Sequence, residues 1–174
     1  MPKKANQQKI LRAKALKKSK EPTRLNILAL DQATKCGIAY ELIGQDPKTK
    51  LWDLSKKTSE SNGVKWLRFE TRLRVFIDTN NIQIIGYELP SGQHMGAKIH
   101  SAKLIAIIEK VAEEKGIEYV EFSSTSIKKF ATDKGNAKKE QMVKSAQDLL
   151  GYDGEDDNEA DALWMLHLMK SEMS

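Results

Sequence analysis

The sequence predicts an α/β fold: a mixed five-stranded sheet with helices on both faces. Two patterns indicate this fold. Three short apolar segments with short links follow residue 24, which is typical of an antiparallel meander. Apolar segments then alternate with helical patterns, as they do in strand–helix units. As a third observation, 174 residues with 40% hydrophobic composition fit one domain with a core of its own.

The expected strands are short apolar segments that end at polar or turn-forming residues. They cover residues 25–31, 37–44, 50–55, 82–90 and 117–123. The first three form the meander. Each of the last two precedes a helical pattern, so the sheet is expected to be mixed.

Four helices are expected. Residues 64–80 have apolar side chains at 64, 67, 69, 73, 76 and 77, which is the spacing of an amphipathic helix. A second helix covers 99–115 and ends at Gly116. Residues 127–151 contain a short turn, a basic loop and a helix that ends at Gly151. The last helix, 159–173, is apolar nearly all round.

The positive charge is concentrated at the start of the chain. Residues 1–24 contain nine Lys and Arg but a single acid, Glu21, whereas the rest of the chain is slightly acidic. We therefore expect a basic N-terminal arm over 1–24 and a globular domain over 25–174. Such an arm either binds nucleic acid or another polyanion, or it is a solvated tail.

Composition excludes several other classes of protein. No apolar run approaches the roughly 18 residues of a membrane span, so no membrane partner is expected. The single cysteine, Cys36, excludes an internal disulfide framework and fits a protein located in a reducing cytoplasm. One cysteine and three scattered histidines also argue against a structural zinc site.

Acidic residues stand at three informative positions. Asp31 and Glu88 end apolar strands, at the edge where open α/β sheets bind ligands. Asp161 lies where an acidic loop enters the last helix, with Asn158 at i, i+3 and Asp157 at i, i+4 on the same face. Any one of these acids, taken alone, is explained by turn formation or by its position at the positive end of the helix dipole. Together they predict a site for Mg²⁺, which prefers oxygen ligands.

Four segments resemble the RuvC family of Holliday-junction resolvases: "ILALDQATKCGIAYE", "IIGYELP", "IKKFATDKGNAKKEQMV" and "NEADALWML". The resemblance implies an RNase H-like fold over about 25–169, with Asp31, Glu88 and Asp161 as the carboxylates that bind metal. The family's fourth acid falls on Asn158, so the resemblance leaves its role to Asn158 or Asp157, with Glu159 as an alternative. Two Mg²⁺ ions per site are implied, with Mn²⁺ as a substitute.

The resemblance also implies how DNA is held. Lys128 and Lys139 match the basic residues near the scissile phosphate, and Lys134 and Lys138 extend the basic loop. Ser91 stands where some members insert an aromatic residue into the junction. Gln32-Ala33 replaces the usual Pro-Gly after the first acid.

Taken together, these patterns predict a Mg²⁺-dependent endonuclease that cuts branched DNA, including four-way junctions. A homodimer formed through the helix at 99–115 is implied, as is a phage-type variant acting in the cytoplasm of a bacterial host. No small-molecule substrate is expected. Two alternatives stay open: a DNA-junction binder that does not cut, and another RNase H-like nuclease acting on flaps or RNA–DNA hybrids.

Overall fold

The computed structural model describes residues 2–173, with side chains from residue 4 onward. One five-stranded sheet runs through the molecule in the order β3-β2-β1-β4-β5. Strands β1, β2 and β3 pair antiparallel, while β1, β4 and β5 run parallel, which confirms the mixed sheet. The strands are β1 (Ile27–Asp31), β2 (Lys35–Glu41), β3 (Lys48–Asp53), β4 (Ile84–Glu88) and β5 (Glu118–Phe122).

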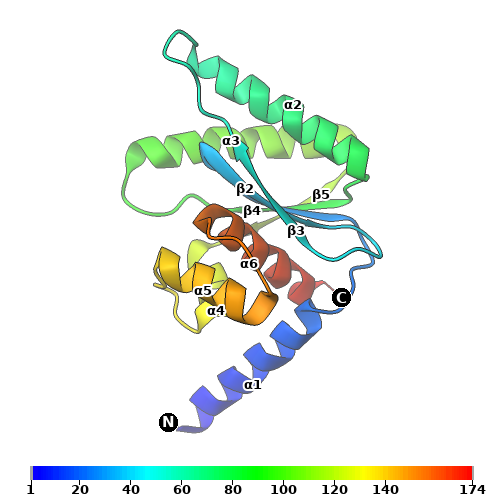
Figure 1. Ribbon diagram of the computed structural model, residues 1–174, viewed down its shortest axis with the longest axis vertical. Coiled ribbons are helices and arrows are strands. Elements are labelled where there is room, and N and C mark those ends of the chain that lie inside the picture. The colour runs from blue at the N-terminus through cyan, green and yellow to red at the C-terminus, as the bar shows by residue number, and fades with distance from the viewer. Residues whose placement is uncertain (1, 174) are drawn as a thin grey trace.

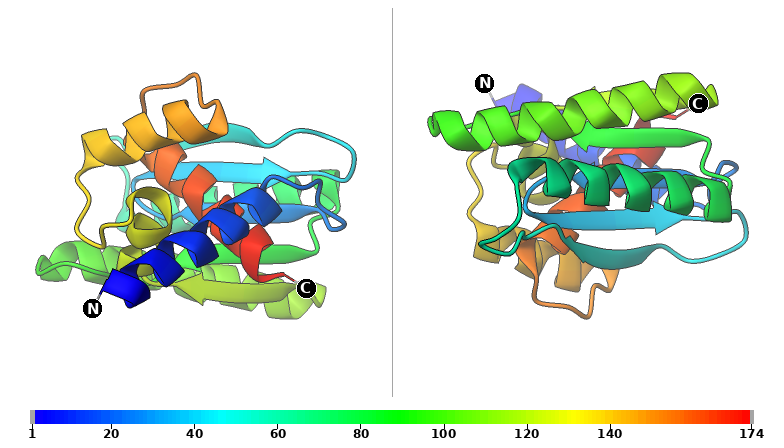
Figure 2. Two further views of the ribbon diagram at one scale, coloured as in Figure 1. Left: turned by 90° about the horizontal axis from the view of Figure 1, so that it is seen from below. Right: turned by 90° about the horizontal axis from the view of Figure 1, so that it is seen from above.

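Helices cover both faces of this sheet, as expected (Figure 1). Helices α2 and α3 lie on one face, and α4, α5 and α6 lie on the other (Figures 1 and 2). The helices are α1 (Pro2–Ser19), α2 (Asn62–Asn80), α3 (Met95–Lys115), α4 (Ser124–Thr132), α5 (Lys139–Leu150) and α6 (Asp157–Glu172). None of these described helices is long and apolar enough to cross a membrane.

Strand β1 divides the core in two because successive side chains of a strand point to opposite faces. Ile27 and Ala29 pack against α4, α5 and α6. Leu28 and Leu30 pack against α2 and α3. All four side chains are fully buried, so the strand that leads to Asp31 is held from both sides.

Helix α6 is the central helix of the layer formed by α4, α5 and α6. It contacts β1 and β2 on one side and α1 and α5 on the other. Every residue from Ala162 to Lys170 is buried, which explains why the sequence is apolar nearly all round. The one cation in this stretch, Lys170, pairs with buried Glu41 at 2.6 Å between Nζ and Oε2.

The basic N-terminal segment is a helix that docks on the domain. The Arg12 guanidinium donates to the carbonyls of Phe130 and Ala131 at the end of α4, both at 2.7 Å. At its other end, the Ser19 hydroxyl lies 2.9 Å from Nδ1 of buried His167 on α6. The boundary at residue 24 stays a prediction, but Arg12 and Ser19 anchor α1 to α4 and α6.

Two elements differ from the sequence-based expectation. The segment expected as a short turn before the basic loop contains α4. Ser123 caps this helix by accepting from the Ser126 N–H at 3.1 Å, and Ile127 and Phe130 bury one face. The residues Ser-Thr-Ser favour a turn locally, so tertiary burial decides the outcome. Helix α3 also begins at Met95, four residues before the expected start.

Candidate active site

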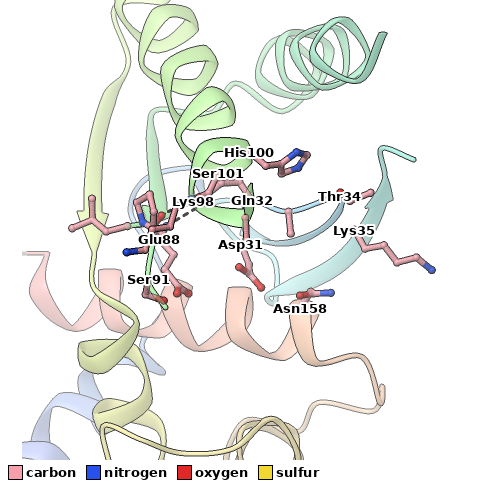
Figure 3. A pocket seen from close by; sticks show the side chains of 14 residues that line it. Asp31, Gln32, Thr34, Lys35, Glu88, Ser91, Lys98, His100, Ser101 and Asn158 are labelled. Atoms are coloured by element: carbon pink, nitrogen blue, oxygen red, sulfur yellow. Dashed lines mark hydrogen bonds between the residues drawn. The ribbon is translucent and has the colours of Figure 1, made fainter. Parts of the chain in front are cut away.

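The candidate site lies where β1 and β4 end. These strands are parallel neighbours, so Asp31 and Glu88 at their carboxyl ends meet at one edge of the sheet. Both carboxylates point toward the first turns of α6 (Figure 3). Asp31, Glu88 and Asn158 line a groove of about 430 Å³, together with Ser91 and others.

A glycine lets α6 approach the sheet at this point. Gly37 of β2 pairs with Asp31 across the β1–β2 ladder. A Cβ on Gly37 would lie 2.0 Å from the carbonyl oxygen of Asn158. Only glycine fits such a close approach of two backbones. The first turn of α6 is therefore seated directly beside Asp31.

The carboxylates of the site repel one another when they are ionised. Burial, followed by the charges of Glu88 and Asp157, raises the pKa of Asp161 to about 7. Burial, followed by the charges of Glu88, Asp161 and Asp157, raises the pKa of Asp31 well above its usual range. Burial also raises the pKa of Glu88, although the Ser124 hydroxyl and Lys128 oppose this shift. Such clusters of acids with raised pKa are typical of functional sites.

This donor set fits a divalent cation. The Oδ1 atom of Asp161 is buried and has no hydrogen-bond partner among the described residues. A buried carboxylate oxygen without a partner is costly, and a cation would satisfy it. As placed, no three acidic, histidine or cysteine side chains of the described residues already converge on one ion. Binding therefore requires the carboxylates to turn toward a common point.

Two of the predicted basic residues lie close to the carboxylates. Lys139, the first residue of α5, pairs with Asp157 at 2.6 Å between Nζ and Oδ2. Lys128 of α4 lies near enough to lower the pKa of both Glu88 and Asp161. The three candidates for the fourth ligand thus differ. The Asp157 carboxylate is paired with a lysine, and that of Glu159 accepts from the Thr49 hydroxyl at 2.5 Å, whereas Asn158 lines the groove.

The remaining predicted DNA-binding residues surround this centre. Lys134 and Lys138 are exposed on the loop between α4 and α5, and Ser91 is exposed at the rim of the groove. Sequence reasoning did not find Lys35 and Lys98, which also line the groove. Nothing in their local sequence distinguishes them from other surface lysines. Lys35 extends away from the carboxylates (Figure 3).

A pH dependence of stability follows from Asp161. Its pKa is about 7 in the folded protein against a usual 3.8, so between pH 4 and 7 the folded state holds a proton that the unfolded chain releases. The free energy of unfolding of the metal-free protein should then fall as pH rises, by at most about 1.4 kcal/mol per pH unit for this group. Urea unfolding in EDTA at pH 5, 6 and 7 measures the slope. Asp161→Asn should reduce it, and an unchanged slope would contradict the assignment.

Comparisons with known proteins agree on the fold. No protein-family model and no curated protein matches the sequence. Among solved structures, Thermus thermophilus RuvC gives a TM-score of 0.65 at 16% identity, covering 83% of this chain and 92% of its own. The same protein in complex with a Holliday junction substrate gives 0.67 at 13% identity, with the same coverage.

A eukaryotic structure is also similar. The yeast mitochondrial Holliday junction resolvase Ydc2 gives a TM-score of 0.60 at 14% identity, covering 94% of this chain and 85% of its own. At these identities the likeness shows the fold, and the RuvC-type, RNase H-like fold expected from the sequence is confirmed.

Proposed function

We propose that this chain is a divalent-metal-dependent endonuclease that cuts branched DNA, including four-way junctions. The observation that carries the proposal is the grouping of Asp31 and Glu88, at the ends of β1 and β4, with Asp161 of α6 on a RuvC-type fold. The proposal draws on the solved structures too, because one of these RuvC structures is a complex with a Holliday junction substrate.

The acidic residues of the site would bind metal, and the basic residues around them would bind phosphate. Asp31, Glu88 and Asp161 would hold the cations, with Asn158 or Asp157 as a further ligand. These residues would hold two Mg²⁺ ions, or Mn²⁺ in their place, whose chemistry when bound would be to activate a water and to stabilise the leaving oxygen. Lys128 and Lys139 would neutralise the scissile phosphate beside the carboxylates, and Lys134, Lys138 and Ser91 would contact the DNA around it.

A homodimer is part of the proposal. Met95 and Ile99 lie on α3 with 68% and 49% of their surface exposed. Their burial against a second copy would place two sites about a two-fold axis, so that opposed strands of a junction could be nicked together. The phage origin and the location in a bacterial cytoplasm stay predictions from the sequence.

Cleavage assays test the proposal against its alternatives. Labelled four-way junction, flap and RNA–DNA hybrid are each incubated with the protein in Mg²⁺ and in EDTA. Paired nicks across the junction that need Mg²⁺ are the expected result. Junction binding without cutting would support the non-catalytic binder, and preferred cleavage of the flap or hybrid would support a different RNase H-like nuclease.

Helix α1 is proposed to add DNA affinity that does not depend on sequence. Lys14 and Lys17 are exposed on a helix that Arg12 holds against the body. Changing both to Glu should weaken binding to junction and plain duplex alike. If both lysines contact phosphates, the slope of log K against log salt should flatten by roughly 1.8, at about 0.9 per contact.

The matched control for this prediction changes two exposed lysines elsewhere. Lys48→Glu with Lys57→Glu makes the same change in net charge on β3 and the loop after it. Titrations in EDTA over a range of salt keep cleavage out of the measurement. Equal slopes for the two double variants would show that α1 acts only through net charge.

A further inference from the structure

Gln32 is a buried polar residue set between the two strand ends of the site. It follows Asp31 directly, and only 5% of its surface is exposed. Its side-chain oxygen accepts from the N–H of Glu88 at 3.3 Å, and its Nε2 donates to the carbonyl of the same residue. Nε2 also donates to the Ser101 hydroxyl of α3 at 3.1 Å (Figure 3).

These bonds replace a missing part of the sheet. The parallel ladder between β1 and β4 ends with the pair Leu30 and Tyr87. One residue further, Asp31 still pairs with Gly37 of β2 but not with β4, and the N–H and C=O of Glu88 bond to the Gln32 side chain instead. A side-chain amide carries the same donor and acceptor as a peptide group. Gln32 therefore satisfies both backbone groups, which would be costly to leave unpaired in this partly buried place.

We infer that Gln32 is a positioning residue that fixes the backbone of Glu88 relative to Asp31 and, through Ser101, ties both strand ends to α3. Its main chain continues directly from Asp31, and its side chain holds Glu88. The two carboxylates would repel each other before a cation binds, so their separation has to be imposed by the surrounding structure. Residues that orient metal ligands in this way commonly change metal affinity by 10- to 100-fold.

The inference rests on the proposed function for the metal site, but its primary test needs no cleavage. Gln32→Met keeps the length of the side chain and removes all three hydrogen bonds. Mn²⁺ binding to wild type and variant is measured by electron paramagnetic resonance of the free ion. We expect the Mn²⁺ dissociation constant to rise roughly 10-fold or more. Junction binding in EDTA should stay within about twofold.

A second pair of variants keeps the test decisive if Gln32→Met fails to fold. Ser101→Ala removes one of the three bonds and should raise the Mn²⁺ dissociation constant by a smaller factor. Ser101→Thr keeps a hydroxyl and should restore the wild-type Mn²⁺ dissociation constant. At saturating Mn²⁺ the cleavage rate of Gln32→Met should stay below that of wild type, because higher ion concentration does not restore the orientation of Glu88.

The outcomes separate the positioning role from the proposed function. If wild type binds Mn²⁺ but cuts no substrate, and Gln32→Met still weakens Mn²⁺ binding, the nuclease proposal fails and the role of Gln32 stands. A folded Gln32→Met with wild-type Mn²⁺ affinity would overturn that role. Wild type that binds no Mn²⁺ would overturn both.

Discussion

Replacing Asp31 with asparagine should abolish cleavage of a four-way junction and leave junction binding intact. The charges of Glu88 on β4 and of Asp161 and Asp157 on α6 all act on Asp31, so its carboxylate is placed to share a cation with both sides of the site. Asparagine keeps the shape but offers only a neutral oxygen. We expect the cleavage rate to fall by roughly 10³-fold or more, since charge stabilisation of the transition state is the largest contribution at such centres.

The same substitution should make the metal-free protein more stable. The raised pKa of Asp31 means that its ionised form is disfavoured in the folded state, so at neutral pH the charge costs folding free energy. Thermal unfolding in EDTA should therefore occur at a temperature a few degrees higher for Asp31→Asn. Higher stability together with lost activity is the combination expected of a site that strains the fold.

Three measurements decide this prediction: cleavage in Mg²⁺, junction affinity in EDTA and melting temperature in EDTA. Asp46→Asn is the matched control because Asp46 is exposed in the loop between β2 and β3, away from the groove. It should change none of the three values appreciably. If Asp31→Asn cut within tenfold of the wild-type rate, the reaction would have to occur elsewhere on the molecule.

The central part of this site could be predicted because local patterns determine it. A short apolar strand that ends in an acid predicts both the strand and the position of the carboxylate, which is how Asp31 and Glu88 were found. Asp161 followed from the helical spacing of the last segment. Placing these acids together needed only the mixed sheet, whose strand order brings β1 beside β4.

The features that were missed depend on contacts between distant parts of the chain. Arg12 bonds to carbonyls more than 100 residues away, so the sequence shows its charge but not the docking of α1. Gln32 reads as one polar residue after an acid, and its role becomes visible only where Glu88 lies opposite. A glutamine at the end of an apolar strand is nevertheless a signal, because a buried amide needs partners.

After Asp31→Asn, we expect Gly37→Ala to cause the largest loss of cleavage activity, together with a loss of stability. The new Cβ would lie 2.0 Å and 2.2 Å from the carbonyl oxygen and carbon of Asn158, and 2.8 Å from the amide nitrogen of Glu159. All three are backbone atoms, so no side-chain rotation relieves the overlap, and the first turn of α6 has to move. We expect a loss of about 1–3 kcal/mol in the free energy of unfolding from overpacking.

The cleavage rate of Gly37→Ala should fall by a larger factor than its stability suggests. The displaced turn begins α6, the helix that carries Asp161. A misplacement of about 1 Å can cost on the order of 10²-fold in rate. Gly63→Ala is the control: in α2 the new Cβ would meet only the Ser61 hydroxyl oxygen, at 3.7 Å. It adds the same methyl group and should leave cleavage unchanged. If Gly37→Ala melted earlier but still cut at the wild-type rate, the first turn of α6 would have no part in holding the metal site.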